Sequence, residues 1–94
     1  MKPRDFEADL AYLEHIRDAA LTIAEHLRGI DEPTFMGSRL LQDAVIRELQ
    51  IVGEATKRLS AALRQANPEV PWQDIAGMRD KLVHDYFGVD IVAV

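Results

Sequence analysis

The chain has 94 residues, of which 48% are apolar and 29% charged, with a net charge of −5 and no cysteine. This composition indicates one small folded domain and excludes disulfides, thiolate metal sites and a cysteine nucleophile. No apolar run is long enough for a signal peptide or a membrane span, so we expect a cytoplasmic protein with no membrane partner. The acidic balance argues against strong general binding of nucleic acid, although residues 1–31 hold most of the acidic excess.

The first predicted element is a long amphipathic helix over residues 5–28. Its apolar residues recur every three or four positions, which predicts one buried stripe: Phe6, Leu10, Leu13, Ile16, Ala20, Ile23 and Leu27. Asp5 is a suitable N-cap and Gly29 a suitable stop signal. His15 and His26 fall on the opposite side, about 16 Å apart along the axis. We interpret them as surface residues, because that separation is too large for one metal ion.

After a turn over residues 29–38, in which Ser38 would be the next N-cap, a second helix is predicted over residues 39–66. It would be a rod about 42 Å long with a wide apolar face. So wide an apolar face on so small a protein implies a partner that covers it. Glu54 on this face can pair with Arg58 one turn later, and a role in positioning Arg79 stays open.

Two prolines, Pro68 and Pro71, end the second helix. A short helical turn is predicted at 72–76, where Trp72 is interpreted as an apolar anchor more than as a platform for a base. A further helix follows at 78–87, and the closing "IVAV" would begin a last helix that is incomplete. The expected fold is all-α, an antiparallel bundle of four to five helices that forms a single domain over residues 1–94.

The helix at 78–87 places an arginine on its apolar face. Arg79 lies within the arc formed by Met78, Leu82, Val83, Tyr86 and Phe87. Such an arginine either extends its guanidinium group to water or binds a carboxylate or another anion at a contact surface. Asp80 lies one turn before His84 and can hydrogen bond its imidazole, although such pairs are more often ordinary surface pairs.

A twofold homodimer would combine these residues. If two copies pack through the face of Leu82, Val83 and Tyr86, Arg79 lies near the axis. Arg79 and His84 of both chains would then line one cleft. That cleft would offer a general acid–base group and a fixed cation for a phosphate.

The spacing Arg79-x4-His84-x-Tyr86 resembles the R-x4-H-x-Y signature of HEPN-domain proteins, specifically the HepT-like toxins. "AVIRELQIVGEATKRLS" (44–60) resembles the second helix of that family, and "VPWQDIAGMRDKLVHDYFGVD" (70–90) resembles its core segment. Such domains usually continue into another helix beyond the point where this sequence stops.

The resemblance implies an all-helical homodimer that is a metal-independent endoribonuclease toxin with no cofactor. Its partner would be a minimal nucleotidyltransferase (MNT) antitoxin, which transfers AMP from ATP onto the motif tyrosine. Carried over to this chain, Arg79 and His84 would be catalytic, Asp80 would be an orienting residue and Tyr86 would be the AMPylated residue.

This chemistry is coherent without a metal or a cysteine, because RNA can be cut by its own 2′-hydroxyl group. The protein then needs an acid–base group with a pKa of about 6–7 and a cation on the phosphorane oxygens. Lys57, Arg58 and Lys81 are candidate contacts for the RNA phosphates, and an ordinary solvated face explains them equally well. A second function class also stays open: a non-catalytic HEPN module that binds nucleotide or docks a nucleotidyltransferase.

Overall fold

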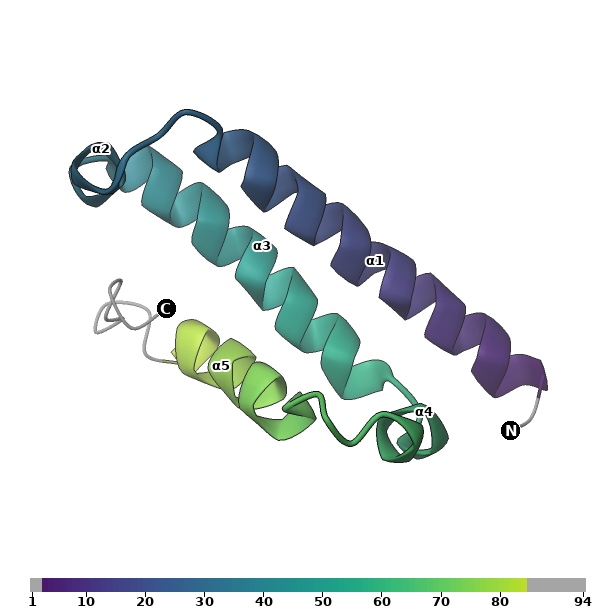
Figure 1. The fold of residues 1–94 in the computed structure, drawn as a ribbon. Helices are drawn as coiled ribbons and strands as arrows, with labels where there is room; N and C mark the ends of the chain where they lie inside the picture. The colour runs from purple at the N-terminus through teal and green to yellow at the C-terminus, as the bar shows by residue number, and fades with distance from the viewer. Residues whose placement is uncertain (1–2, 85–94) are drawn as a thin grey trace.

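The structure, a computed structural model, describes residues 3–84, and their side chains over residues 5–80. This part of the chain forms five helices and no strand: α1 (Pro3–Leu27), α2 (Glu32–Met36), α3 (Arg39–Arg58), α4 (Ala61–Ala66) and α5 (Trp72–His84) (Figure 1). The predicted all-α class is therefore confirmed. The predicted last helix, which would begin at "IVAV", lies outside the described residues, and so does Tyr86 of the helix predicted at 78–87.

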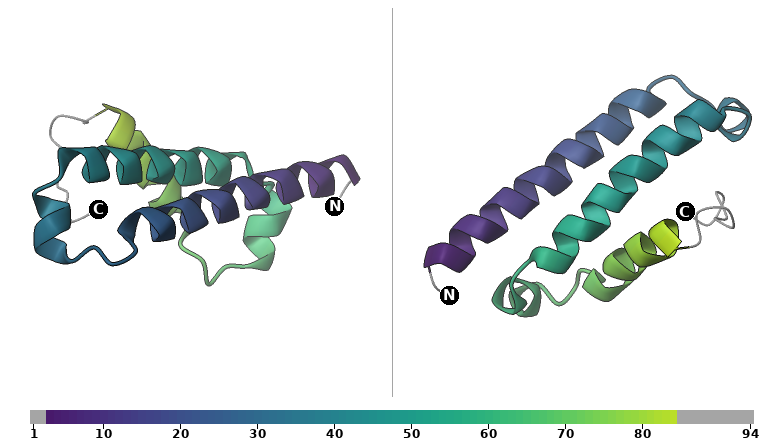
Figure 2. Two further views of the ribbon diagram at one scale, coloured as in Figure 1. Left: turned by 90° about the horizontal axis from the view of Figure 1, so that it is seen from above. Right: turned by 180° about the vertical axis from the view of Figure 1, so that it is seen from behind.

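The central element is α3, which packs against α1 on one side and α5 on the other (Figures 1 and 2). Both neighbours run antiparallel to α3, and the described fold measures 47 × 25 × 20 Å along its principal axes. The buried apolar residues of the described part lie mostly on α3 or next to it: Ala19, Val45, Ile46, Ala55 and Leu59. The position of α3 means that its residues can reach both neighbouring helices.

The predicted second helix is wrong in one respect, because the segment 39–66 is two helices. The chain leaves the helical conformation at Leu59 (ψ 143°), and Ser60 caps α4 by accepting a hydrogen bond from the N–H of Leu63. The carboxylate of Asp9 on α1 accepts hydrogen bonds from the backbone N–H of Ser60 at 2.7 Å and from its hydroxyl at 2.5 Å. This long-range contact, which periodicity cannot reveal, fixes the break.

The predicted division between residues 72–76 and 78–87 is also wrong. A single helix, α5, runs through Gly77 from Trp72 to His84. Its first residue is tied to α4, since the indole N–H of Trp72 donates to the carbonyls of Arg64 (3.2 Å) and Asn67 (3.0 Å). These contacts show Trp72 as an anchor of α5 through its indole N–H, whereas its interpretation as an apolar anchor stays a prediction.

Two of the predicted helix boundary residues are confirmed and one is wrong. Ser38 caps α3 by accepting from the N–H of Leu41 at 3.1 Å, and Gly29 ends α1 with a φ of +70°, as predicted. Asp5 is not an N-cap, because α1 already begins at Pro3. The predicted turn contains the short helix α2, which is capped by Asp31.

The stripe predicted for α1 is not the buried one: Phe6, Leu10, Leu13 and Ala20 are exposed, Ile16, Ile23 and Leu27 are half-buried, and the buried residues of this helix are Asp9 and Ala19. Phe6 and Leu10 are 59% and 48% exposed, whereas Asp9 is only 2% exposed. The hydrogen bonds from Ser60 draw Asp9 to the packed face, so Phe6 and Leu10 are turned outward. An apolar stripe therefore remains on the surface of α1. None of the described helices is long and apolar enough to cross a membrane.

Candidate functional site

The site is built where α5 meets α3 at Gly53. A Cβ atom built on Gly53 would overlap the Cβ of Arg79 and lie 2.9 Å from its Cγ. Only glycine therefore allows the helices to approach this closely. As a result, Arg79 packs on α3 of its own chain, with 27% of its side chain exposed.

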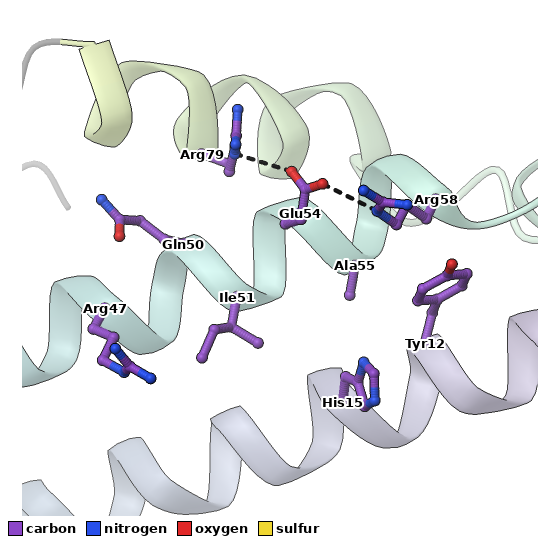
Figure 3. Close-up of a pocket in the computed structure, with 9 residues that line it drawn as sticks. All are labelled: Tyr12, His15, Arg47, Gln50, Ile51, Glu54, Ala55, Arg58 and Arg79. Carbon is purple, nitrogen blue, oxygen red and sulfur yellow. Dashed lines mark hydrogen bonds and ion pairs between the residues drawn. The ribbon is translucent and has the colours of Figure 1, made fainter.

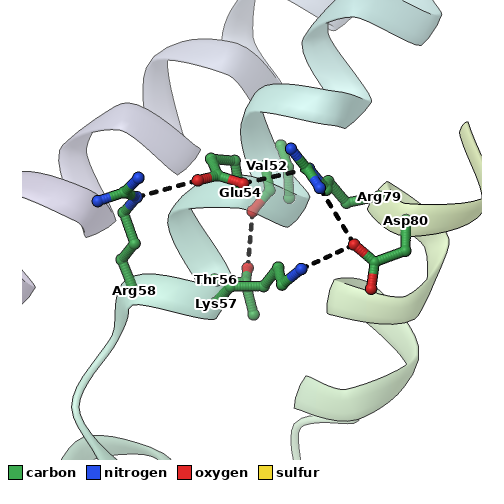
Figure 4. A network of polar contacts seen from close by, with 7 residues as sticks. All are labelled: Val52, Glu54, Thr56, Lys57, Arg58, Arg79 and Asp80. Atoms are coloured by element: carbon green, nitrogen blue, oxygen red, sulfur yellow. Dashed lines mark hydrogen bonds and ion pairs between the residues drawn. The ribbon is translucent and has the colours of Figure 1, made fainter. Parts of the chain in front are cut away.

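Two carboxylates hold the guanidinium of Arg79. Its Nε lies 3.1 Å from Oε2 of Glu54, and its Nη1 lies 3.2 Å from Oδ1 of Asp80. Glu54 also binds Nε of Arg58 at 3.0 Å, and Asp80 binds Nζ of Lys57 at 2.7 Å (Figure 4). The five side chains form one chain of alternating charge that joins α3 to α5. Each exposed pair contributes little alone, but a network fixes geometry better than single pairs do.

This network shifts two pKa values. The pKa of Asp80 is lowered, chiefly by the hydrogen bond from Lys57 and next by that from Arg79. The pKa of Arg58 is raised, first by its hydrogen bond to Glu54 and then by that to Tyr12. Both shifts favour the charged forms of Asp80 and Arg58.

The structure brings together four of the residues that the sequence singled out: Lys57, Arg58, Arg79 and Asp80. The pairing of Glu54 with Arg58 is confirmed, and so is its contact with Arg79. His84 is the last residue of α5, and the structure describes only its backbone. The side chains of Lys81 and His84, and all of Tyr86, lie outside the described residues, so their predicted roles stay predictions.

Asp80 has partners that the sequence did not predict. Its Oδ1 accepts hydrogen bonds from Lys57 and Arg79. The predicted hydrogen bond between Asp80 and His84 would be a third contact of this carboxylate. In the described part of the protein, Asp80 holds the guanidinium of Arg79 in position.

Beside the network lies a groove of about 490 Å³ between α1 and α3 (Figure 3). Arg79 lines it from α5, and the other lining residues are Tyr12, His15, Arg47, Gln50, Ile51, Glu54, Ala55 and Arg58. The sequence reasoning missed the part played by Tyr12, His15 and Arg47. The spacing of Arg47, Ile51, Glu54 and Arg58 by three or four residues could have indicated one shared face of α3. Among the described residues, no three acidic or histidine side chains are grouped so as to hold a metal ion.

The comparisons with known proteins identify the family. Residues 12–94 match the family described as "Ribonuclease HepT-like". The chain belongs to the HepT-like ribonuclease family of HEPN proteins. The match includes the groove, the network and the complete Arg79-x4-His84-x-Tyr86 motif.

Individual relatives agree with the family. A protein of Caldanaerobacter subterraneus named "Putative RNase TTE0752" is 46% identical over 79 residues, which cover 84% of this chain and 70% of that protein. The "Probable ribonuclease HepT" of Thermococcus cleftensis is 46% identical over 80 residues, or 85% of this chain and 73% of its own length. "Putative RNase MJ0125" of Methanocaldococcus jannaschii is 37% identical and aligns with 100% of this chain and 78% of its own length. No solved structure matches the chain.

Proposed function

We propose that this HepT-like protein is a metal-independent endoribonuclease and the toxin of a HEPN/MNT toxin–antitoxin pair. The observation that carries the proposal is the held guanidinium of Arg79, five positions before His84 in the family's motif. Glu54 and Asp80 fix it at the edge of a groove, with part of the side chain exposed. A cation held in advance can stabilise charge that develops on a phosphorane without reorganising.

The proposed reaction uses the RNA's own 2′-hydroxyl as the nucleophile. The 2′-oxygen loses its proton to a base and bonds to phosphorus, and the bond from phosphorus to the 5′-oxygen breaks as that oxygen gains a proton. His84 serves as the proton-transfer group, because imidazole exchanges protons near neutral pH. Arg79 stabilises the charge on the phosphorane oxygens. The products are a 2′,3′-cyclic phosphate and a free 5′-hydroxyl.

The proposal includes a homodimer. In the dimer, α5 of each chain contacts its copy, which adds the second Arg79 and His84 to one cleft. Scattering of light at micromolar concentration is expected to give twice the 10.6 kDa of one chain. A mass equal to one chain would contradict this assembly.

Activity separates the ribonuclease from a non-catalytic module that binds nucleotide or docks a nucleotidyltransferase. The test is incubation of the unmodified protein with single-stranded RNA, and with DNA of the same sequence, in the presence of EDTA. A ribonuclease of this mechanism cuts the RNA and leaves the DNA intact, because DNA has no 2′-hydroxyl. The non-catalytic module would cut neither.

The proposed partner is an MNT antitoxin that transfers AMP onto Tyr86. AMP at this position would bring negative charge and a purine close to Arg79. It would offset the positive charge of Arg79 and block the binding of RNA. Intact mass after incubation with ATP and a cognate MNT enzyme is expected to rise by one or more AMP units. Tyr86→Phe removes the phenolic oxygen that accepts AMP, so it should abolish the gain. A gain that persisted in this variant would exclude Tyr86 as the acceptor.

A further inference from the structure

The groove between α1 and α3 contains charged and aromatic side chains that the proposed cleavage step does not use. Three arginines and one carboxylate line it, in a chain whose net charge is −5. A local excess of positive charge in a hollow of an acidic protein indicates an anionic ligand. Arg47 lies toward one end of the groove and Tyr12 toward the other, beside Arg58, with His15 between them, and these are the lining residues whose role is open (Figure 3).

Arg47 differs from the other two arginines of the groove. Arg58 and Arg79 share the carboxylate of Glu54. Arg47 is exposed and makes no ion pair with any side chain in the described part of the protein. Its charge is therefore available to a ligand, and a guanidinium suits a phosphate because it donates two parallel hydrogen bonds.

Tyr12 and His15 supply an aromatic surface on α1, away from the Arg47 end of the groove (Figure 3). They lie one turn apart on α1, and their rings meet edge to face with centroids 6.1 Å apart and an interplanar angle of 79°. Tyr12 is half-buried, whereas His15 is exposed. An exposed ring that rests edge to face against a half-buried one offers a face on which an unpaired base can stack.

The groove also has the size and direction that a nucleic acid strand needs. Its volume is about 490 Å³, and Arg47 and Arg58 lie about 16 Å apart along α3. At a rise of about 3.4 Å per stacked nucleotide, this length accommodates several nucleotides. Because a base within a duplex cannot leave the stack to meet a ring, these contacts favour single strands.

We propose that this groove binds unpaired nucleotides of RNA next to the bond that is cut. Arg47 contacts a backbone phosphate at one end of the groove, and the pair Tyr12–His15 stacks a base further along the same strand. This inference rests on the proposed function, since Arg79, which lines the same groove, marks the position of the phosphate that reacts. A free mononucleotide carries the same phosphate and base, so the experiment must separate it from an RNA strand.

The experiment measures binding of a short fluorescent RNA whose 2′-positions are methylated, which prevents cleavage by the 2′-hydroxyl mechanism. Fluorescence anisotropy is recorded over a range of salt concentrations, with ATP as a competitor. Arg47→Gln is expected to weaken binding about fivefold and to lower the slope of log K against log salt by about 0.7, the value for one phosphate contact on a single strand. Arg17→Gln, which removes the same charge from α1 outside the groove, is the matched control and should bind within about twofold of wild type.

The aromatic contact is tested at His15, since its exposure makes substitution compatible with folding. His15→Ala should weaken binding by about fivefold or more, and His15→Phe, which retains a ring, should restore it. Wild-type binding by both Arg47→Gln and His15→Ala would overturn the proposal, as would a wild type that does not bind the RNA. Displacement of the RNA by ATP at micromolar concentration would show a mononucleotide site instead.

The outcomes also separate this inference from the proposed function. If the wild type cuts RNA, and the Arg47→Gln variant binds and cuts RNA as well as the wild type does, the groove proposal is wrong. The ribonuclease proposal then stands. If RNA binding depends on Arg47 but the protein cuts nothing, the groove is a binding site and the ribonuclease proposal is wrong.

Discussion

Gly53 on α3 lies directly against Arg79 on α5, and a residue with a Cβ atom does not fit at position 53 unless Arg79 moves. The missing Cβ of Gly53 leaves the space that the Cβ and Cγ of Arg79 occupy. The arginine can therefore lie low enough on α3 for its Nε to reach Glu54, the residue after Gly53. The approach of the two helices and the direction of the proposed catalytic cation thus depend on a single glycine.

Gly53→Ala is predicted to separate α5 from α3. Because the new methyl group overlaps Arg79, the free energy of unfolding should fall by about 1–3 kcal/mol. Thermal unfolding followed by circular dichroism should show a Tm lower by about 4 °C or more. The matched control is Gly77→Ala on α5, where a Cβ meets nothing within 4 Å. This control should raise stability by about 0.5–1 kcal/mol, because alanine favours a helix interior. Equal stability of both variants would contradict the role of Gly53.

Glu54→Gln is predicted to reduce RNA cleavage without unfolding the protein. The amide retains the size of the side chain but loses the charge that holds Arg79. A misplaced catalytic group can cost up to about a hundredfold in rate, so we expect a loss of about ten- to a hundredfold in kcat/KM. The loss should be absent in an Arg79→Ala background, because Glu54 acts through Arg79. Glu48→Gln, on the same helix outside the network, is the control and should cut at the wild-type rate. An equal loss from Glu54→Gln with and without Arg79 would exclude a positioning role.

Asp80 is predicted to titrate below the usual aspartate pKa of about 3.9. Its hydrogen bond from Lys57, and next that from Arg79, lowers its pKa in the folded state. A lowered folded pKa stabilises the protein fully above the unfolded pKa, and this contribution is lost as pH falls through the folded pKa. NMR titration of the side-chain carboxyl carbon is the measurement. Lys57→Gln should move the midpoint upward, and a midpoint that did not move would show that Lys57 is not the main cause.

The buried carboxylate of Asp9 is predicted to be a major contributor to stability. It accepts both hydrogen bonds that Ser60 donates, and Asp9→Ala would leave the N–H of Ser60 without this partner. The unsatisfied group should cost about 1–3 kcal/mol. Chemical denaturation measures this loss, with the exposed Glu14→Ala on the same helix as the control. If the two substitutions destabilised the protein equally, the contact with Ser60 would not be important.

The sequence predicted several features of this fold that depend on neighbouring residues. The long first helix, the cap at Ser38 and the stop at Gly29 follow from local patterns, and the structure has all three. The break at Ser60 could not be predicted, because it depends on Asp9, which lies 51 positions away in the sequence. The same contact turns α1, so the buried face of that helix was misassigned.

The candidate site also has parts that local sequence patterns predict and parts that depend on tertiary contacts. The motif Arg79-x4-His84-x-Tyr86 and the pair Glu54–Arg58 are visible in the sequence because their members are separated by short fixed distances. The groove is not, since Tyr12 and His15 of α1 line it together with residues of α3 only after the two helices have packed. The contact of Gly53 with Arg79 is also tertiary, and a glycine within a helix gives no indication of which residue lies above it.

The central claim is that Arg79 and His84 cut RNA through its own 2′-hydroxyl. The most direct measurement is cleavage of a labelled single-stranded RNA in EDTA by wild type, Arg79→Ala and His84→Ala, with the mass of the 5′ fragment determined. We predict a 2′,3′-cyclic phosphate on that fragment for wild type. Cleavage should fall by about 10²–10³-fold without Arg79 and by about 10²–10⁴-fold without His84, while both variants remain folded. Cleavage at the wild-type rate by both variants, or a fragment that ends in a free 3′-hydroxyl, would contradict the claim.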